Sequence, residues 1–594
     1  SVKDDAVKDI NSIENSKMKA AEDEKASKVI IQYYEDKLVF YHNGEPFDEE
    51  DVRGVSSMLM GTKDREDAQT IGRFGMGFKS VFKYTHQPEI YSDEEAFCIR
   101  NYLLPVEIKE GWDYLSEKDK VACRLGDGRI SYPFRKEEHL TKIIIPFTKR
   151  KDDGSIQAIS GQDVVKKLED LDGEILLFLS YIKELYWIDT TRNKYALIAL
   201  EQSREDIDLV TCRMEGSSFG NKEEITRYLR FLKVFNHPDM RNANVGIAYK
   251  VNNRANNINE TKDNRISVYF PTKDETSLPF LVHGSFETAV SREKLMEPSD
   301  FNNDLYDELR NLICESLEKL ADRQLITQTF IRRILIPAFN EERIAGLKEK
   351  ITDQFKTKCL LPDIHNEYLM ATDLSLAIPF GISDFFESTL FSSSFNSVLS
   401  FVALSDEKGA GFTDYFSWLK DDIGVRVFSL DSWAQQLQLM EKNHLIANSN
   451  EREDLMKLYA FLSDYRESLY ERNTGYSSYR SGYSRSGPYE ATLKTVLSSA
   501  WSTLRTAPIV LNAERRLVAA YMESSEQIYL NSSSKYKKVV SSAIVDSKVA
   551  EEYKQLLEEG LQINEFDNYQ YVKEKVIKKY VEIKQRILEY TANN

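Results

Sequence analysis

Several features that would assign this chain to a simple class are missing from its 594 residues. No run of about 18 apolar residues occurs, so the sequence predicts no membrane-spanning helix. The first residues are charged and lack the apolar core of a secretory signal peptide. Five cysteines are scattered without a C-x-x-C pair. This pattern favours reduced thiols in the core of a cytoplasmic protein over disulfides or a zinc site.

Metal and nucleic-acid chemistry also have little support in the composition. The seven histidines lie far apart, and none falls in an H-E-x-x-H motif or a similar ligand spacing. Asp and Glu outnumber Lys and Arg by 96 to 79, which gives a formal net charge of −17. This excess disfavours broad electrostatic binding to nucleic acid, although a local basic groove is compatible with it. The second half of the chain contains no Ser/His/Asp, Cys/His or nuclease constellation.

The chain does contain enough apolar material for several cores. Hydrophobic residues make up 41% of the sequence and aromatic residues 11%. Because a chain of this length exceeds what one core can hold, we expect two to four domains. The sequence begins without Met and ends in a charged helical pattern, which leaves open that it is part of a longer protein.

The most informative stretch is the glycine-rich segment at residues 71–82, Ile-Gly-Arg-Phe-Gly-Met-Gly-Phe-Lys-Ser-Val-Phe. Because glycine has no Cβ and tolerates positive φ, such a backbone turns tightly and approaches a ligand closely. A turn that opens a helix directs unpaired N–H groups and the positive end of the helix dipole at an anion, most often a phosphate. The residues of this segment assigned to cofactor binding are Gly72, Phe74, Gly75, Met76, Gly77, Phe78 and Lys79. Among them Phe74 and Phe78, with Val81 and Phe82, are predicted to anchor the loop in the core, and Lys79 could reach a phosphate.

The glycine-rich segment lacks the Gly-Lys-Ser/Thr ending of a P-loop and follows no clear βαβ unit, which argues against a dinucleotide fold. Its string resembles the second glycine box of the GHKL (Bergerat-fold) ATPases, and it is most similar to that of heat-shock protein 90-like chaperones and sacsin ATPase repeats. The resemblance implies ATP and Mg²⁺ as cofactors. It also implies an α+β fold: an N-terminal Bergerat α/β sandwich, an α/β middle domain and a mostly helical C-terminal region.

A second box precedes the glycine-rich segment. Residues 29–41 show two short apolar runs around an acidic turn, which predicts a β-hairpin. The hairpin leads into His42, Asn43 and Gly44. In the GHKL family this box begins with Asp, whose carboxylate accepts a hydrogen bond from the adenine amino group, and the resemblance puts His42 there. A neutral imidazole can accept one hydrogen bond if its tautomer is fixed. We therefore predict nucleotide binding with less secure base selectivity; an ordinary Asn-Gly turn is the alternative.

In this family the helix upstream carries Glu-x-x-x-Asn, with both side chains on one face. The resemblance aligns Asn15 with the Asn that completes the Mg²⁺ shell. The catalytic Glu aligns with Asn11, which cannot act as a general base. Asp9 and Glu14 are nearby carboxylates, but neither shares the face of Asn15. Either the register of this alignment is different, or hydrolysis is slow or absent. We therefore predict ATP binding more firmly than turnover.

Two further elements complete the predicted nucleotide site. Residues 51–70 form a polar segment behind a small apolar patch, which is typical of a mobile lid. Lys63 in this lid is a candidate phosphate contact, and a solvated loop lysine is the alternative. Residues 139–147 resemble the strand that closes the GHKL site, where a Thr hydroxyl helps to bind adenine through water. Thr141 is the matching residue.

The following segment resembles the middle domain of heat-shock protein 90-like and sacsin-type proteins. Residues 162–187 are amphipathic and then apolar, which predicts a helix between two domains. Alternating strands and then a Ser-Arg-Glu sequence follow. In the family, this loop sends an arginine back to the γ-phosphate, and Arg292 is the matching residue. A guanidinium suits this task because it stays charged and can bind phosphate oxygens bidentately. By itself, Ser-Arg-Glu is more typical of a helix N-cap.

The resemblance covers about residues 1–330 and little of the remainder. The predicted divisions are an ATP-binding domain at 1–160, a linker helix at 161–190, a middle domain at 191–330, and a mixed, mainly helical C-terminal region at 331–594. A low-complexity stretch at 473–489 is predicted to be a flexible connector. Its Tyr and Arg residues could instead stack on nucleic-acid bases. The last helix carries one apolar stripe, which packs internally or pairs with another chain: Val572, Val576, Tyr580, Ile583 and Ile587.

The leading hypothesis is an ATP-binding, chaperone-like conformational ATPase of the sacsin or heat-shock protein 90-like type. Closure over Mg·ATP would dock Arg292 and bias two conformations. Bacterial proteins with this layout resemble components of stress or anti-phage defence systems. We expect a protein client or partner subunit and no membrane, and we leave homo-oligomerisation open. One alternative is a catalytically weak nucleotide sensor or scaffold, which Asn11 favours. A DNA-acting GHKL protein is the other, and the acidic charge argues against it.

Overall fold

The computed structural model describes most of the chain outside a few stretches. The described residues are 27–56, 78–93, 95–109, 112–121, 123–124, 130–131, 134, 138–204, 207–220, 222–262, 264–289, 291–379, 381–392, 399–404, 410–465, 500–521, 527–530 and 543–592. The chain divides into two compact units. The first unit contains residues 1–325 and 329–348, and the second contains residues 326–328 and 349–594.

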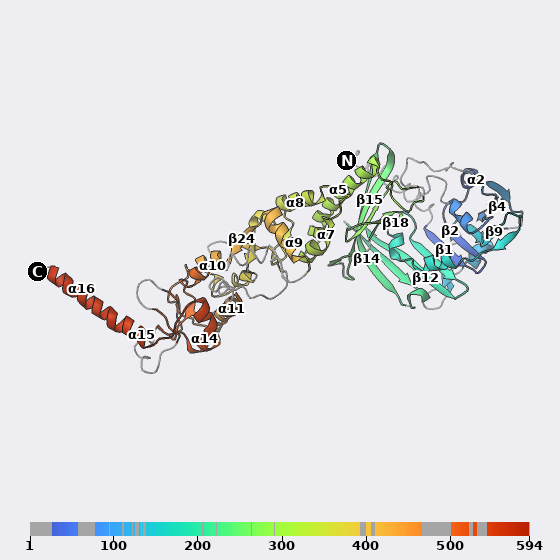
Figure 1. Cartoon of the computed structure of the whole chain (residues 1–594). Helices are drawn as coiled ribbons and strands as arrows, with labels where there is room; N and C mark the ends of the chain where they lie inside the picture. Colours follow the sequence, from blue (N-terminus) through green and yellow to red (C-terminus); the bar gives the residue numbers. More distant parts are fainter. Residues whose placement is uncertain are drawn as a thin grey trace, which may run out of the picture. The chain divides into compact units, whose positions relative to one another are not determined.

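One large sheet dominates the first unit, where the described residues contribute fifteen strands to it (Figure 1). The order is β18-β17-β19-β15-β14-β13-β12-β11-β1-β2-β8-β3-β4-β5, and β16 pairs with β15. The strands are β1 Lys28–Tyr33, β2 Lys37–His42, β3 Glu89–Ser92, β4 Glu95–Arg100, β5 Leu104–Glu107, β8 Thr141–Pro146, β11 Glu184–Asp189, β12 Lys194–Arg204, β13 Asp208–Glu215, β14 Glu224–His237, β15 Met240–Val251, β16 Ile258–Asn259, β17 Arg265–Val268, β18 Phe270–Glu275 and β19 Leu281–Gly284.

Helices and two small ladders complete the first unit. The helical segments are α2 Glu49–Ser56, η1 Phe78–Lys83, α3 Tyr114–Lys120, α4 Gln162–Glu169, η2 Gly173–Leu176, η3 Ser217–Phe219, α5 Asp300–Asp322, α6 Gln328–Phe330, η4 Ile331–Leu335 and α7 Ile336–Ala338. The ladders pair β6 Cys123–Arg124 with β7 Ile130–Ser131, and β9 Thr148–Arg150 with β10 Ile156–Ala158. The longest of these helices, α5, packs along β15 (Figure 1).

The predicted hairpin and the predicted closing strand are both confirmed. Strands β1 and β2 pair antiparallel, with Val29 opposite His42. β2 then pairs with β8, which covers most of the stretch predicted at 139–147. On its other side β1 pairs in parallel with β11, from Lys28 opposite Glu184 to Tyr33 opposite Asp189. This parallel pair makes one continuous sheet from the two sequence regions on either side of α4.

The long linker helix predicted over 161–190 is wrong. Helix α4 covers only its beginning, η2 adds one short turn, and β11 occupies its end. Gly173, at the start of η2, packs closely, because a Cβ there would lie 2.7 Å from the Cβ of Cys212. The apolar run that follows is buried on all sides, with Leu176 and Leu177 fully inaccessible. It therefore forms core beneath the sheet, where an amphipathic helix would have exposed one side.

The second unit is mainly helical with short ladders, and the α+β class predicted for the chain is confirmed. Its elements are α8 Leu347–Thr357, β20 Leu361–Pro362, β21 Tyr368–Leu369, η5 Ala371–Asp373, β22 Leu374–Ile378, η6 Ile382–Phe385, β23 Ser400–Phe401, α9 Phe412–Ser417, η8 Trp418–Ile423, β24 Arg426–Ser429, α10 Leu430–Leu437, α11 Ser449–Tyr465, β25 Val510–Leu511, β26 Leu517–Val518, α14 Ser547–Glu552, η11 Leu556–Gly560, α15 Asn568–Tyr571, η12 Val572–Ile577 and α16 Lys578–Ala592. Trp433, Tyr459 and Trp501 lie in its main apolar cluster.

The predicted boundaries and the last helix have different outcomes. The boundaries at 160/161 and 190/191 fall inside the first unit, and 330/331 falls where the chain passes between the units. As domain limits they stay predictions.

The apolar stripe on the last helix is exposed, from 46% at Val572 to 69% at Tyr580. The alternative that this stripe packs internally is therefore wrong, and the alternative that it pairs with another chain stays a prediction. Among the described helices, none combines the length and the apolar character that crossing a bilayer requires.

Candidate functional site

Many residues predicted for the nucleotide site cannot be placed. The following lie outside the described residues: Asn11, Asn15, Lys63, Gly72, Phe74, Gly75, Met76 and Gly77. The predicted lid and the connector at 473–489 lie outside them as well, apart from the first residues of the lid, which end α2. The predicted residues that can be placed are His42, Asn43, Gly44, Phe78, Lys79, Thr141 and Arg292.

Three polar side chains form a row across the ends of β2, β8 and β3, which we call the site row: His42, Thr141 and Ser92. Thr141 on β8 lies opposite His42 on β2 and opposite Ser92 on β3. Residues directly opposite in antiparallel strands share a face, so the three side chains lie on one side of the sheet. Thr141 and Ser92 are almost completely buried, and their hydroxyl oxygens are 2.7 Å apart. The Ser92 hydroxyl oxygen also accepts the Phe47 N–H at 2.9 Å.

The site row lies at the end of an apolar layer that joins the sheet to α2 and η1. Two residues away along their strands, Ile143 and Ile90 lie on the same face as Thr141 and Ser92. Both isoleucines belong to a cluster that includes Val52, Val55, Phe78 and Phe82. Helix η1 begins at Phe78, within the glycine-rich segment and directly after the last of its glycines in the sequence. The fold therefore brings the predicted base-binding residues to the face on which the chain leaves the predicted phosphate-binding loop.

The His-Asn-Gly box forms a tight turn held by its own side chains. The Gly44 N–H donates to Nδ1 of His42 at 3.2 Å. The Asn43 amide oxygen accepts the backbone N–H groups of Ser27 and Lys28, at 2.8 and 3.0 Å, and its amide nitrogen donates to the Ser27 hydroxyl. Asn43 is buried and fastens the start of β1 to the end of β2. In this structure its side chain has a structural task.

Lys79 is held by backbone carbonyls. Its ammonium donates to the carbonyl oxygens of Val55 and Tyr102, each at 2.7 Å. Burial lowers the pKa of Lys79 below its usual value. Because Val55 belongs to α2 and Tyr102 to the turn between β4 and β5, this side chain ties η1 to both elements. Its predicted contact with phosphate stays a prediction, and would require the ammonium to exchange at least one of these carbonyls.

Arg292 lies at the tip of a short, well-defined loop. The loop is closed by the bridge between Thr288 and Leu295 and by the Ala289 N–H, which donates to the Lys294 carbonyl at 2.9 Å. The backbone N–H of Arg292 donates to the Ala289 carbonyl, and its φ of 57° is in the left-handed region. A non-glycine residue adopts this conformation only where its surroundings impose it. The exposed guanidinium is thus carried on a constrained turn, and the helix N-cap alternative is wrong.

Strand β18 anchors the arginine loop from below. The Lys273 ammonium lies 2.7 Å from the Glu293 carboxylate, and the Lys273 N–H donates to the Glu293 carbonyl at 2.6 Å. The Asp274 carboxylate accepts the Leu295 N–H, also at 2.6 Å. Lys273 holds the pKa of the Glu293 carboxyl below its usual value. The C-terminal side of the arginine loop, at Glu293 and Leu295, is therefore fixed to β18.

Helix α4 contacts the residue that follows η1. At its first turn, the Asp163 carboxylate accepts the hydroxyl of Tyr84, which directly follows η1, at 2.7 Å. One turn later in the same helix, Lys167 adds to the lowering of the pKa of Glu293, behind the larger effect of Lys273.

Sequence reasoning missed the third member of the site row and the anchors of the arginine loop. A usable signal existed for Ser92, because buried Ile90 precedes it by two residues at the end of a strand. That alternation assigns both residues to one face. Lys273 and Asp274 carry no comparable signal, since their importance depends on which loop folds over β18.

The opposite face of the same three strands carries a different row, which we call the cage row: Tyr41, Lys142 and Tyr91. The Lys142 ammonium lies 5.8 Å from the ring centres of Tyr41 and Tyr91 and 5.5 Å from that of Trp112. It also contacts the Glu117 carboxylate at 2.6 Å. Burial and the neighbouring Glu117 carboxylate raise the pKa of Tyr41. An aromatic cage here holds a cation of the protein itself.

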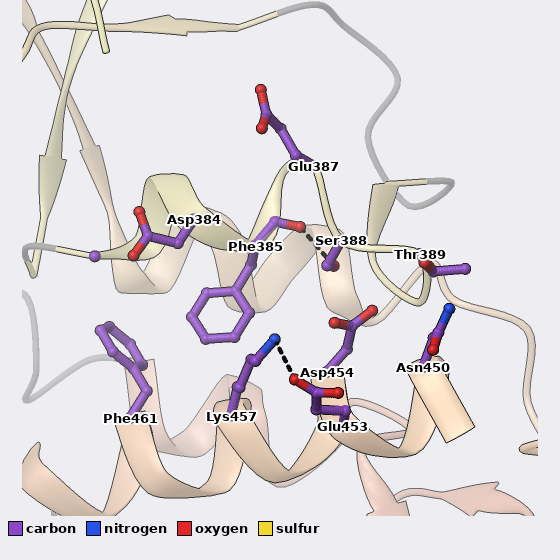
Figure 2. Close-up of a pocket in the computed structure, with 11 residues that line it drawn as sticks. Asp384, Phe385, Glu387, Ser388, Thr389, Asn450, Glu453, Asp454, Lys457 and Phe461 are labelled. Carbon is purple, nitrogen blue, oxygen red and sulfur yellow. Dashed lines mark hydrogen bonds and ion pairs between the residues drawn. The ribbon is translucent and has the colours of Figure 1, made fainter. Parts of the chain in front are cut away.

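A separate hollow of about 540 Å³ lies in the second unit, between η6 and α11 (Figure 2). Its lining residues are Gly381, Asp384, Phe385, Glu387, Ser388, Thr389, Asn450, Glu453, Asp454, Lys457 and Phe461. Figure 2 shows Lys457 beside Glu453, and their charged atoms are 2.9 Å apart. None of the residues predicted from sequence lines this hollow.

Comparison with known proteins identifies the region around the site. Residues 7–110 match the family described as Sacsin domain. A stretch of 58 residues is 40% identical to sacsin of Homo sapiens, which corresponds to 10% of this chain and 1% of that protein. The predicted resemblance to sacsin is confirmed over this region. The matched region contains His42, Ser92 and the glycine-rich segment, and it ends before Thr141 and Arg292.

Two solved structures have lower similarity over more of the chain. The B-subunit of the DNA gyrase from Myxococcus xanthus is 10% identical, with a TM-score of 0.27 over 50% of this chain and 85% of that chain. The N-terminal domain of a DNA repair protein is also 10% identical, with a TM-score of 0.25 over 53% of this chain and 93% of that chain. At these TM-scores the likeness carries no conclusion about fold or function.

Proposed function

We propose that the first unit binds ATP in the layer between the sheet and α2 and η1. One observation carries the proposal: the buried row of His42, Thr141 and Ser92 lies on the face from which η1 leaves the glycine-rich segment. The match of residues 7–110 to the Sacsin domain supports it independently. In this arrangement the site row faces the base, and the backbone N–H groups of the glycine-rich segment face the phosphates.

The hydroxyl pair in the site row suits a polar ligand. Thr141 and Ser92 have two hydroxyl protons between them, and only one proton can lie in the hydrogen bond that joins their oxygens. The other proton can be donated to a base or to a bound water. Because both residues are buried, such a bond would form away from bulk water, where leaving a donor unpaired is costly. Bound nucleotide would relieve that cost.

Arg292 is the residue that we assign to the γ-phosphate. A guanidinium on a constrained turn loses little conformational freedom when it contacts an anion, and it can hold two oxygens at once. Mg²⁺, when bound, would neutralise phosphate charge, and Asn15 would hold it. Asn11 replaces the expected general base, so we infer that turnover is slow.

The wider role that follows is a cytoplasmic, chaperone-like conformational ATPase that acts on a protein client or partner subunit. Stress response or anti-phage defence is the setting that the resemblance suggests. A nucleotide sensor without turnover is the second candidate, and Asn11 favours it because an amide cannot deprotonate water. A DNA-acting role is the third, and the formal net charge of −17 argues against it.

Equilibrium binding and steady-state turnover of ATP test the proposal together. Gly75→Val adds a branched side chain at the predicted phosphate loop and should lower ATP affinity at least about 100-fold. Arg292→Ala should leave affinity within about threefold and lower any turnover at least about tenfold. Arg254→Ala, which removes an exposed arginine from another loop of the same unit, is the matched control.

The outcomes separate the candidates. Normal ATP binding by both Gly75→Val and Arg292→Ala, with unchanged turnover, would show that the site is assigned wrongly. Binding without turnover in the parent protein supports the sensor. ATP turnover that DNA stimulates, with a strong dependence on salt, would support the DNA-acting alternative.

A further inference from the structure

The last helix is a basic element in an acidic chain. It runs without interruption through α15, η12 and α16, residues 568–592. Over this span the sequence has six Lys and Arg residues and three Glu residues, whereas the whole chain has a formal net charge of −17. Every described side chain from Val576 to Glu589 is exposed. None of the described elements therefore covers the helix over this stretch.

The apolar stripe on this helix has the spacing of a coiled-coil seam. Four of its residues are separated by four, three and four positions: Val576, Tyr580, Ile583 and Ile587. This spacing places them alternately at positions d and a of a heptad. Ile583 is 48% exposed and Ile587 is 57% exposed. Since a seam of this kind is stabilised when the apolar residues of another helix pack into it, the stripe indicates a surface for a second helix.

The charged side chains are sorted about this seam. Lys579 and Arg586 fall at position g and Lys584 falls at position e, and these positions flank the seam on its two sides. All three side chains are exposed. Glu582 and Glu589 fall at position c, away from the seam. A helix that packs on the stripe therefore meets basic residues on both sides of the apolar contact.

This arrangement disfavours a second copy of the chain as the partner. In a parallel pair, position g of one helix faces position e of the next heptad on the other helix, so Lys579 would face Lys584. In an antiparallel pair, e faces e and g faces g, and the charged residues that face one another are again all basic. Like charges at these positions oppose pairing. A carboxylate at the facing positions would instead form an ion pair across the seam.

Lys584 also disfavours an anionic bilayer as the partner surface. The exposed apolar surface continues beyond the stripe at Ile577, Val581 and Leu588. Lys584 lies between the two parts, one helical turn after Tyr580 and one before Leu588. A helix that lies in a bilayer surface buries one broad apolar face and keeps its charges on the opposite face. Here the middle of the apolar face carries a cation, which a carboxylate on a partner helix can pair.

We propose that the apolar stripe of the last helix is a docking surface for an acidic helix of a partner protein. The partner helix has apolar residues at its own a and d positions and Asp or Glu at the positions beside them. Its apolar residues cover the stripe, and its carboxylates pair with Lys579, Lys584 and Arg586. None of these residues belongs to the proposed ATP site, so the two surfaces can be tested separately.

Binding of two synthetic peptides to the full chain tests the proposal. Both peptides are amphipathic helices of equal length with Ile and Leu at positions a and d, but one has Glu at every e and g position and the other has Lys there. Fluorescence anisotropy should show that the acidic peptide binds at least about tenfold more tightly than the basic peptide. The triple variant Lys579→Glu, Lys584→Glu and Arg586→Glu should reverse this order. Ile583→Asp with Ile587→Asp should remove binding of the acidic peptide.

A second triple variant controls for the overall charge of the chain. Lys442→Glu, Arg515→Glu and Lys548→Glu change the net charge by the same amount at exposed sites of the second unit outside the last helix. This variant should keep the preference for the acidic peptide. Urea unfolding of each variant shows that the fold is retained.

Three kinds of result would overturn the inference, and each leaves the proposed ATP site standing. The first is a parent chain that binds neither peptide or binds both equally well. The second is self-association of the parent in sedimentation that Ile583→Asp with Ile587→Asp removes, because the stripe then pairs with a second copy. The third is tighter binding of the parent to phosphatidylserine vesicles than to the acidic peptide, because a bilayer then covers the stripe.

Discussion

The site row and the cage row occupy neighbouring positions on the same three strands, but they differ in role. The site row belongs to the proposed ligand site, and the cage row holds an ion pair within the protein. His42, Thr141 and Ser92 lie on the side of α2 and η1, and the hydroxyls of Thr141 and Ser92 have one proton more than their shared hydrogen bond uses. Tyr41 and Lys142, one residue along, lie on the other side, where the Lys142 cation is already paired with Glu117 and surrounded by rings.

The difference shows how the two-residue period of a strand separates binding from stabilisation. Since successive side chains point to opposite faces, one short strand can supply a ligand-binding group and a structural ion pair at adjacent positions. The cage row also fastens Glu117 of α3 to the sheet. Disrupting one row should therefore change nucleotide affinity, and disrupting the other should change stability.

Loss of the cage-row cation should have the largest effect on stability. Lys142→Met keeps the length of the side chain and its ring contacts, but leaves the Glu117 carboxylate, which is 16% exposed, without its closest cation. We expect unfolding in urea to become easier by about 2–4 kcal/mol, with ATP affinity of the folded protein unchanged. The double variant Lys142→Met with Glu117→Leu should recover most of the loss. A drop in affinity without a drop in stability would contradict the division between the rows.

Acid should destabilise the unit through a histidine that belongs to neither row. His283 is buried and stacks on Phe178 with ring centres 4.9 Å apart, and its Nε2 lies 2.9 Å from the Asn244 amide oxygen. Burial lowers the pKa of His283 to about 3. Since the unfolded chain takes up its proton near pH 6.5 and the folded chain does not, stability falls as pH falls through this window.

The expected loss at pH 5 is about 2 kcal/mol relative to pH 8. Urea unfolding at several pH values measures it, and His283→Gln should flatten the slope between pH 5 and 6.5. An unchanged slope in this variant would assign the acid sensitivity to other groups. Comparisons of the two rows are therefore best made above pH 7.

A smaller effect should separate affinity from stability within the site row. Thr141→Val replaces the hydroxyl by a methyl group of similar size. It should lower ATP affinity about tenfold, while stability changes by about 1 kcal/mol, because the Ser92 hydroxyl keeps the Phe47 N–H. Isothermal titration and urea unfolding of one preparation give both values. Unchanged affinity in the folded variant would remove Thr141 from the proposed base site.

The local pattern of apolar and polar residues was sufficient to predict two of the strands on which the site row lies. Alternation around residues 29–41 predicted the β1–β2 hairpin, and the apolar run after Thr141 predicted β8. Both signals depend only on neighbouring residues, which is why they survived into the tertiary structure. The glycine-rich segment and the His-Asn-Gly box likewise pointed to the sacsin resemblance that the match at residues 7–110 bears out.

Only the tertiary structure decided what several of these side chains touch. The Lys79 ammonium is held by carbonyls from two elements, and Asn43 by the backbone at the start of β1. The stretch expected to be a long helix became core and a strand, because β11 found β1 as a parallel partner far away in sequence. Composition and spacing determine which groups are available, but partners distant in sequence determine which hydrogen bonds they make. The use of Nδ1 in His42 belongs to that second class, since it depends on how the backbone turns at Gly44.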